Sequence, residues 1–112
     1  MLDEKHFKTV LEEVCDQVFN GKGEERHGHG LPLECQPWKT ITDNVGSGFV
    51  LGQAMKKLME LKTFTPKDDT KEERDRAIRA WKREALGAIV YTVMAIMYKE
   101  YEKESKRESI KK

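Results

Sequence analysis

The stretch Ala85–Met97, ALGAIVYTVMAIM, decides how this sequence folds. Its apolar side chains fall on nearly every face of a helix, and no charged residue interrupts it. A helix of this kind has to be surrounded by protein, because no side of it suits water. The charge-free run ends at Tyr98, well short of the roughly 20 residues that a membrane span needs. We therefore expect a buried helix, and no membrane partner.

The rest of the chain is strongly polar. Of its 112 residues, 37% are charged and 38% are hydrophobic, whereas an average soluble domain has about 25% charged residues. Such a chain buries only a small core, so we expect a single helical domain over residues 1–112 that forms a homo-oligomer. The 21 Lys and Arg residues nearly balance the 20 Asp and Glu residues. Since nucleic-acid binders usually carry a basic excess, we do not expect nucleic acid as a partner.

The start of the chain predicts a helix and then a loop. Apolar residues recur with a helical period over residues 2–19, and Asn20-Gly21 ends the pattern. No apolar signal segment precedes this helix, and the two cysteines make no disulfide framework, so a cytoplasmic location is expected. Residues 20–36 are rich in glycine and form the predicted loop.

Two more helical blocks follow. The second begins between Pro37 and Asp43 and has its body at 49–62, and the glycines at 46 and 48 allow a bend at its start. The third runs from about Lys71 to about Lys106, with Asp68, Asp69 or Thr70 as its cap. Residues 99–112 form a charged helix end or tail. No β pattern is present, so the predicted fold is all-α: a three-helix bundle-like protomer with a long C-terminal helix and a glycine-rich loop, which oligomerises.

The glycine-rich loop carries groups that suit an anion. Arg26 can hold two phosphate oxygens at once, and the backbone N–H groups around His27 and Gly28 can donate to others. The spacing is not that of a P-loop. A solvated hinge, with Arg26 paired to Glu24 or Glu25, remains the alternative.

The same loop also contains residue types that bind zinc. His27, His29 and Cys35 could be joined by Cys15, although this spacing matches no compact zinc finger. A buried, inert Cys15 is the alternative.

Further along the chain, aromatic and charged residues supply other candidates. Trp38 fits either a core position or a platform for a base, whereas Trp81 is in register with the apolar run and is expected in the core. Lys56 and Lys57 lie on a polar stripe, and antiparallel packing could bring Lys56 to one groove with Arg83-Glu84. A solvated helix face explains that stripe equally well.

The order of these features resembles small phage proteins of the nucleotide-modification-associated, MazG-like helical type. The resemblance covers roughly residues 11–97 and rests on the loop Glu25-Arg26-His27-Gly28, a Trp, a Lys-containing helix, and an acidic residue before Ala88-Ile89-Val90-Tyr91. It implies that Arg26, Gly28, Lys57, Glu84 and Tyr91 face a ligand. His27 stands where that family usually has Tyr, and Glu60 where a basic residue is usual.

MazG-like pyrophosphohydrolases hold Mg²⁺ with two acidic pairs. In this chain Glu13-x2-Asp16 could serve as the first pair, but Glu84-x2-Gly87 lacks its second carboxylate. The resemblance therefore favours binding of a nucleotide-like phosphate compound without turnover and without a cofactor. A phage protein that sequesters a nucleotide signal of host defence would fit. A Mg²⁺-dependent nucleoside-triphosphate pyrophosphohydrolase is the alternative, and a helical interaction protein that simply dimerises is a third possibility.

The candidate ligand-binding residues are Arg26, His27, Gly28, Trp38, Lys56, Lys57, Arg83, Glu84 and Tyr91, and the candidate metal ligands are Glu13 and Asp16.

Overall fold

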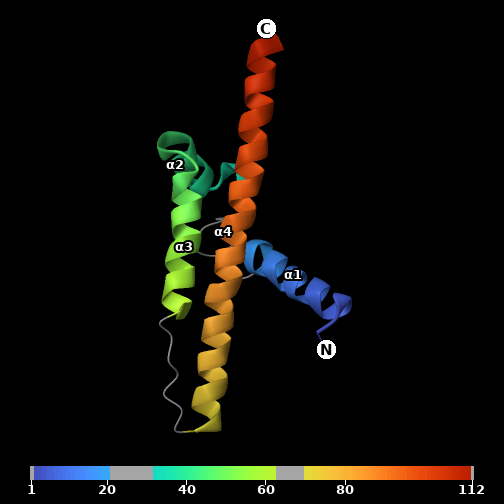
Figure 1. Cartoon of the computed structure of the whole chain (residues 1–112), viewed down its shortest axis with the longest axis vertical. Coiled ribbons are helices and arrows are strands. Elements are labelled where there is room, and N and C mark those ends of the chain that lie inside the picture. Colours follow the sequence, from blue (N-terminus) through green and yellow to red (C-terminus); the bar gives the residue numbers. More distant parts are fainter. Residues whose placement is uncertain (1, 21–31, 63–69, 112) are drawn as a thin grey trace.

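The computed structural model describes residues 2–20, 32–62 and 70–111. Within them the chain forms α1 (Glu4–Phe19), a 3-10 turn η2 (Leu33–Cys35), α2 (Pro37–Val45), α3 (Gly48–Lys62) and α4 (Lys71–Lys111). No strand occurs in these described ranges, so the predicted all-α class is confirmed. Figure 1 shows α4 as a long axis with the other helices arranged along it.

Polar caps set the ends of the first and last helices. The Asp3 side chain accepts a hydrogen bond from the His6 N–H at 2.9 Å, and α1 ends at Asn20 as predicted. Thr70 caps α4 by accepting from the Glu73 N–H at 3.1 Å, which selects it among the three predicted caps. The helix then continues to Lys111, so the charged segment 99–112 is helical as far as the structure describes it.

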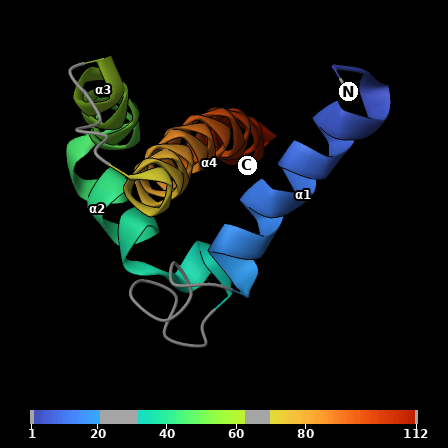
Figure 2. The same ribbon diagram turned by 90° about the horizontal axis from the view of Figure 1, so that it is seen from below.

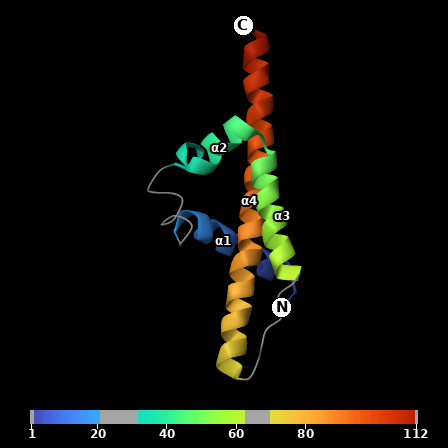
Figure 3. The same ribbon diagram turned by 90° about the vertical axis from the view of Figure 1, so that its left-hand side faces the viewer.

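The predicted second block is two helices rather than one. Gly46 separates α2 from α3, with a φ of 92° that L side chains rarely adopt. The sequence suggested a bend at this point, but the backbone turns too sharply for a single helix. Viewed from the side in Figure 3, α2 runs across the long axis of the molecule while α3 runs along it.

The main packing contact joins α3 and α4, which run antiparallel. Its core is a cluster of three buried side chains, Val50, Met94 and Ala95, with Val50 fully buried. Trp38 and Tyr91 pack against the same cluster. Met94 and Ala95, near the end of the Ala85–Met97 stretch, therefore contribute to the core, as its composition predicts.

A single chain leaves much apolar surface exposed. The radius of gyration is 16.9 Å, whereas a compact domain of this length would have about 13 Å. Trp81, expected in the core, is 43% exposed, and Val93 is equally exposed. The expectation that protein surrounds the whole apolar run is therefore not met within one chain. None of the helices in the described ranges is long and apolar enough to cross a membrane.

Candidate functional site

The most distinctive charged contact lies where α3 meets α4. The Lys57 ammonium on α3 is 3.1 Å from Glu84 Oε2 on α4. The Lys57 side chain is only 26% exposed and that of Glu84 is 41% exposed, so the pair lies at the edge of the interface between the helices. These residues are two of the three helix candidates that the resemblance implied, and the structure brings them together.

Gly87 makes room for the Lys57 side chain. It is buried in the middle of α4, one turn after Glu84. A Cβ atom at this position would lie 3.0 Å from Cε, 3.1 Å from Cδ and 3.3 Å from Nζ of Lys57, all tighter than ordinary contacts. Glycine inside a helix costs roughly 1 kcal/mol relative to alanine. Here it lets the lysine stem lie flat across α4 and reach the carboxylate one turn back.

Two further cationic candidates, Lys56 and Arg83, are exposed. Lys56 is exposed and lines a shallow hollow on the outer side of α3 with Met55 and Met59. It therefore does not join the groove that the sequence predicted, and Lys57 takes that place instead. Arg83 is exposed beside Glu84, and its main-chain oxygen accepts a long 3.5 Å hydrogen bond from the Gln17 side chain.

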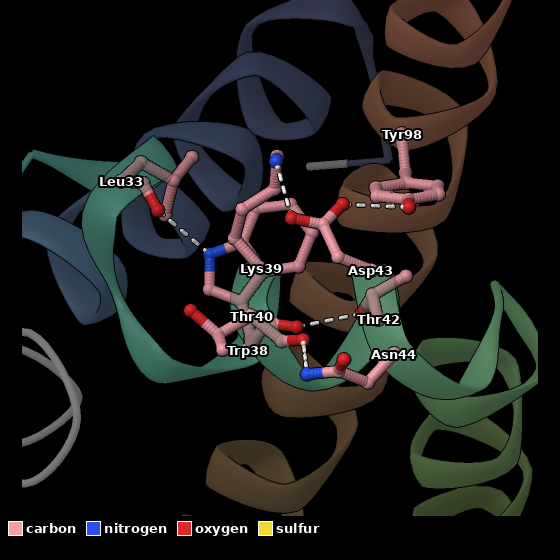
Figure 4. Close-up of polar contacts among 8 residues, drawn as sticks. All are labelled: Leu33, Trp38, Lys39, Thr40, Thr42, Asp43, Asn44 and Tyr98. Atoms are coloured by element: carbon pink, nitrogen blue, oxygen red, sulfur yellow. Dashed lines mark hydrogen bonds and ion pairs between the residues drawn. The ribbon is translucent and has the colours of Figure 1, made fainter.

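The two aromatic candidates pack as core side chains. Trp38 is half-buried against the Val50 cluster, and its indole N–H donates to the Leu33 main-chain oxygen at 2.9 Å (Figure 4). Of the two interpretations of Trp38, this geometry matches the core position. Tyr91 is also half-buried against the same cluster.

A polar clamp that was not predicted from the sequence joins α2 to α4. The Tyr98 hydroxyl donates to Asp43 Oδ1 at 2.8 Å, and the Lys39 ammonium lies 2.7 Å from Asp43 Oδ2 (Figure 4). The same ammonium lies 4.2 Å from the centre of the Tyr101 ring, within the range of a cation–π contact. The clamp fixes α2 over α4. It is separate from the Lys57–Glu84 pair, because Tyr98 follows Glu84 by 14 residues along α4.

Hydrogen bonding in the clamp shifts three pKa values. The bond from Lys39, followed by the bond from Tyr98, lowers the pKa of the Asp43 carboxyl. The hydrogen bond that Lys39 donates to Asp43 raises the pKa of Lys39. The bond to the Asp43 carboxylate, helped by burial, raises the pKa of Tyr98 to about 12. All three shifts favour the protonation states that hold the clamp together near neutral pH.

Both candidate metal ligands on α1 contact other side chains. Glu13 pairs with Lys82 of α4, and Asp16 accepts a hydrogen bond from the Asn20 side chain at 3.3 Å. Among the residues that the structure describes, no three His, Cys, Asp or Glu side chains come together as a metal site would require. The described residues alone therefore do not make up the Mg²⁺ site that the MazG-like alternative implies, and Glu13 and Asp16 stay predicted ligands.

Several candidates lie outside the described residues. Arg26, His27, Gly28 and His29 all belong to the segment 21–31, so their predicted roles stay predictions. Cys15 and Cys35 are both exposed free thiols, so the alternative of a buried Cys15 is wrong.

No model of a known protein family matches the chain. No curated protein and no solved structure matches it significantly either.

Proposed function

We propose that this protein binds a nucleotide-like phosphate compound at helix junctions of a homo-oligomer, without turning it over. The observation that carries the proposal is the Lys57 ammonium, which is held by Glu84 above Gly87 at the junction of α3 and α4. An ammonium group has three N–H donors. The bond to Glu84 uses one of them and fixes the direction of the other two, which can donate hydrogen bonds to phosphate oxygens.

The position of Gly87 supports binding rather than metal-dependent hydrolysis. In the MazG-like pattern the residue three positions after the acidic one, here Gly87, would be a second carboxylate. In this chain the lysine stem occupies the space beside that position. The remaining N–H groups of the Lys57 ammonium can donate to phosphate oxygens directly, whereas a Mg²⁺ ion would need several oxygen ligands there.

The glycine-rich loop would supply the remaining contacts. Arg26 is the leading candidate, because a guanidinium can hold two phosphate oxygens and stays charged at any working pH. Loss of a charge-assisted hydrogen bond typically costs about 1.5–3 kcal/mol. Arg26→Ala should therefore weaken binding roughly ten- to a hundred-fold, at about 1.4 kcal/mol per factor of ten. If a protonated His27 also meets the phosphate, His27→Ala should weaken binding more at pH 6 than at pH 8.

A thermal-shift screen against linear and cyclic nucleotides tests the proposal. A compound that binds only the folded chain adds about 2.7 kcal/mol at a hundred-fold excess over its Kd, which corresponds to a rise in Tm of about 10 °C for a domain of this size. Incubation with each hit and Mg²⁺, followed by an assay for pyrophosphate, separates the two functions. A hit without released pyrophosphate supports the proposal, and released pyrophosphate favours the hydrolase. No shift with any nucleotide contradicts both.

A further inference from the structure

Three arginines follow one another along one side of α4. Arg76, Arg79 and Arg83 are spaced at i, i+3 and i+7, which places them on the same face of the helix, about one turn apart. All three are exposed. The start of α4 extends past the end of α3 in Figure 1, and Figure 2, which views α4 nearly end-on, shows α3 and α1 on different sides of it. We call Arg76, Arg79 and Arg83 the arginine row.

Lys57 of α3 continues the arginine row. The next position on the same face of α4, four residues after Arg83, is Gly87. The Lys57 ammonium lies 3.3 Å from where a Cβ atom of residue 87 would be, and Cβ atoms at i and i+4 of a helix are about 5–6 Å apart. The ammonium therefore stands about one turn beyond Arg83. The four cations extend along about 16 Å of α4, at about 1.5 Å per residue.

The arginine row has no ion-pair partner among the side chains that the structure describes. Glu72 and Asp75 lie one turn before Arg76 and Arg79, but the ion pairs formed within the described residues all use lysines. Like charges three or four residues apart destabilise a helix. A row of unpaired arginines therefore weakens α4 by itself, and an anion bound along the row would relieve the repulsion.

We propose that the arginine row and Lys57 bind one anion that carries two or more linked phosphate groups. The inference rests on the proposed function for the phosphate at Lys57, and it names the class of ligand, because a single phosphate there would leave the row unused. A guanidinium can donate two parallel hydrogen bonds to phosphate oxygens and keeps its charge at any working pH. Arg83, beside Lys57, should therefore bind the second phosphate, and Arg79 should meet a longer chain of phosphates.

Calorimetric titration of the full chain with orthophosphate, pyrophosphate and tripolyphosphate, at constant ionic strength, tests the inference. The affinity of the wild type should rise with the number of phosphates. Arg83→Gln should weaken the binding of tripolyphosphate by roughly ten-fold or more, as expected for the loss of a charge-assisted hydrogen bond, and should affect orthophosphate much less.

Arg74→Gln is the matched control. Arg74 is exposed and precedes Arg83 by nine residues, about two and a half turns, so it lies on the opposite side of α4. The variant removes the same charge and should leave both affinities nearly unchanged. Only the main-chain oxygen of Arg83 accepts the bond from Gln17, so the Tm of Arg83→Gln without ligand should equal or slightly exceed that of the wild type.

Two results would overturn the inference. One is equal affinity of the wild type for orthophosphate and tripolyphosphate. The other is an equal loss in Arg74→Gln and Arg83→Gln, which would show a general attraction between charges. Binding of tripolyphosphate through Arg83, with no nucleotide bound, would support the arginine row and contradict the nucleotide of the proposed function. Nucleoside mono- and triphosphates that bind equally tightly, with no effect of Arg83→Gln, would contradict the row and leave the proposed function standing.

Discussion

Replacing Gly87 by alanine should separate the stability of this protein from its affinity for phosphate. Alanine in place of glycine inside a helix typically stabilises a protein by about 0.4–1 kcal/mol, because it restricts the unfolded chain. At Gly87 the new methyl group would lie 3.0–3.3 Å from the end of the Lys57 side chain, which has to move. The ion pair that is disturbed is partly exposed and contributes under about 1 kcal/mol. The free energy of unfolding should therefore change by less than about 1 kcal/mol in either direction.

The affinity should respond differently. If the fixed Lys57 ammonium binds phosphate, Gly87→Ala should displace it and so weaken binding roughly ten-fold for the nucleotide that gives the largest thermal shift. Gly52→Ala is the matched control: Gly52 also lies inside a helix, and a Cβ there meets nothing within 4 Å. Urea denaturation and calorimetric titration of both variants give the two quantities. Unchanged affinity in Gly87→Ala, or an equal loss in Gly52→Ala, would refute the role of Lys57.

Three other predictions follow from the fold. Gly46→Ala should lower the free energy of unfolding by about 1–3 kcal/mol in urea, because its φ of 92° strains any other residue; an unchanged midpoint would contradict this. Val50→Ala should cost about 2 kcal/mol, at about 0.8 kcal/mol per buried methylene plus a cavity, and half-exposed Leu51→Ala should cost clearly less. The pKa of Tyr98 is raised to about 12 from about 10 in the unfolded chain, so the stability that its hydroxyl contributes is complete below pH 10 and is lost as the pH rises through 12. Tyr98→Phe should therefore reduce the fall of Tm over this pH range, and a pH profile of Tm identical to that of the wild type would contradict the role of the Tyr98 hydroxyl.

Local chemistry explains why much of the helical architecture was predictable. Helix ends depend on short-range signals, and the predicted cap Thr70 and the predicted end at Asn20 are both confirmed. The split at Gly46 was only partly predictable, because a glycine permits a left-handed conformation without requiring one. The exposure of Trp81 could not be predicted from its register, since register gives a side of the helix but not what covers that side.

The candidate site was predictable in its residue types and not in its pairing. The resemblance singled out Lys57 and Glu84, and the structure pairs them, whereas Lys56 is exposed and lines a shallow hollow with Met55 and Met59. The role of Gly87 was missed, because a missing carboxylate in a motif says nothing of the side chain that fills its space. The Asp43–Tyr98 clamp was missed because its two residues are 55 positions apart and belong to no motif.

In the proposed function a fixed side-chain cation, and not a metal ion, holds the phosphate. Calorimetric titration of the best nucleotide from the thermal screen into the wild type and Lys57→Gln, each in EDTA and in Mg²⁺, distinguishes the two. We expect binding by the wild type that EDTA leaves unchanged, and a loss of roughly ten- to a hundred-fold in Lys57→Gln, the usual effect of removing one charge-assisted hydrogen bond. Binding that disappears in EDTA, or that is equally tight in Lys57→Gln, would refute this role of Lys57.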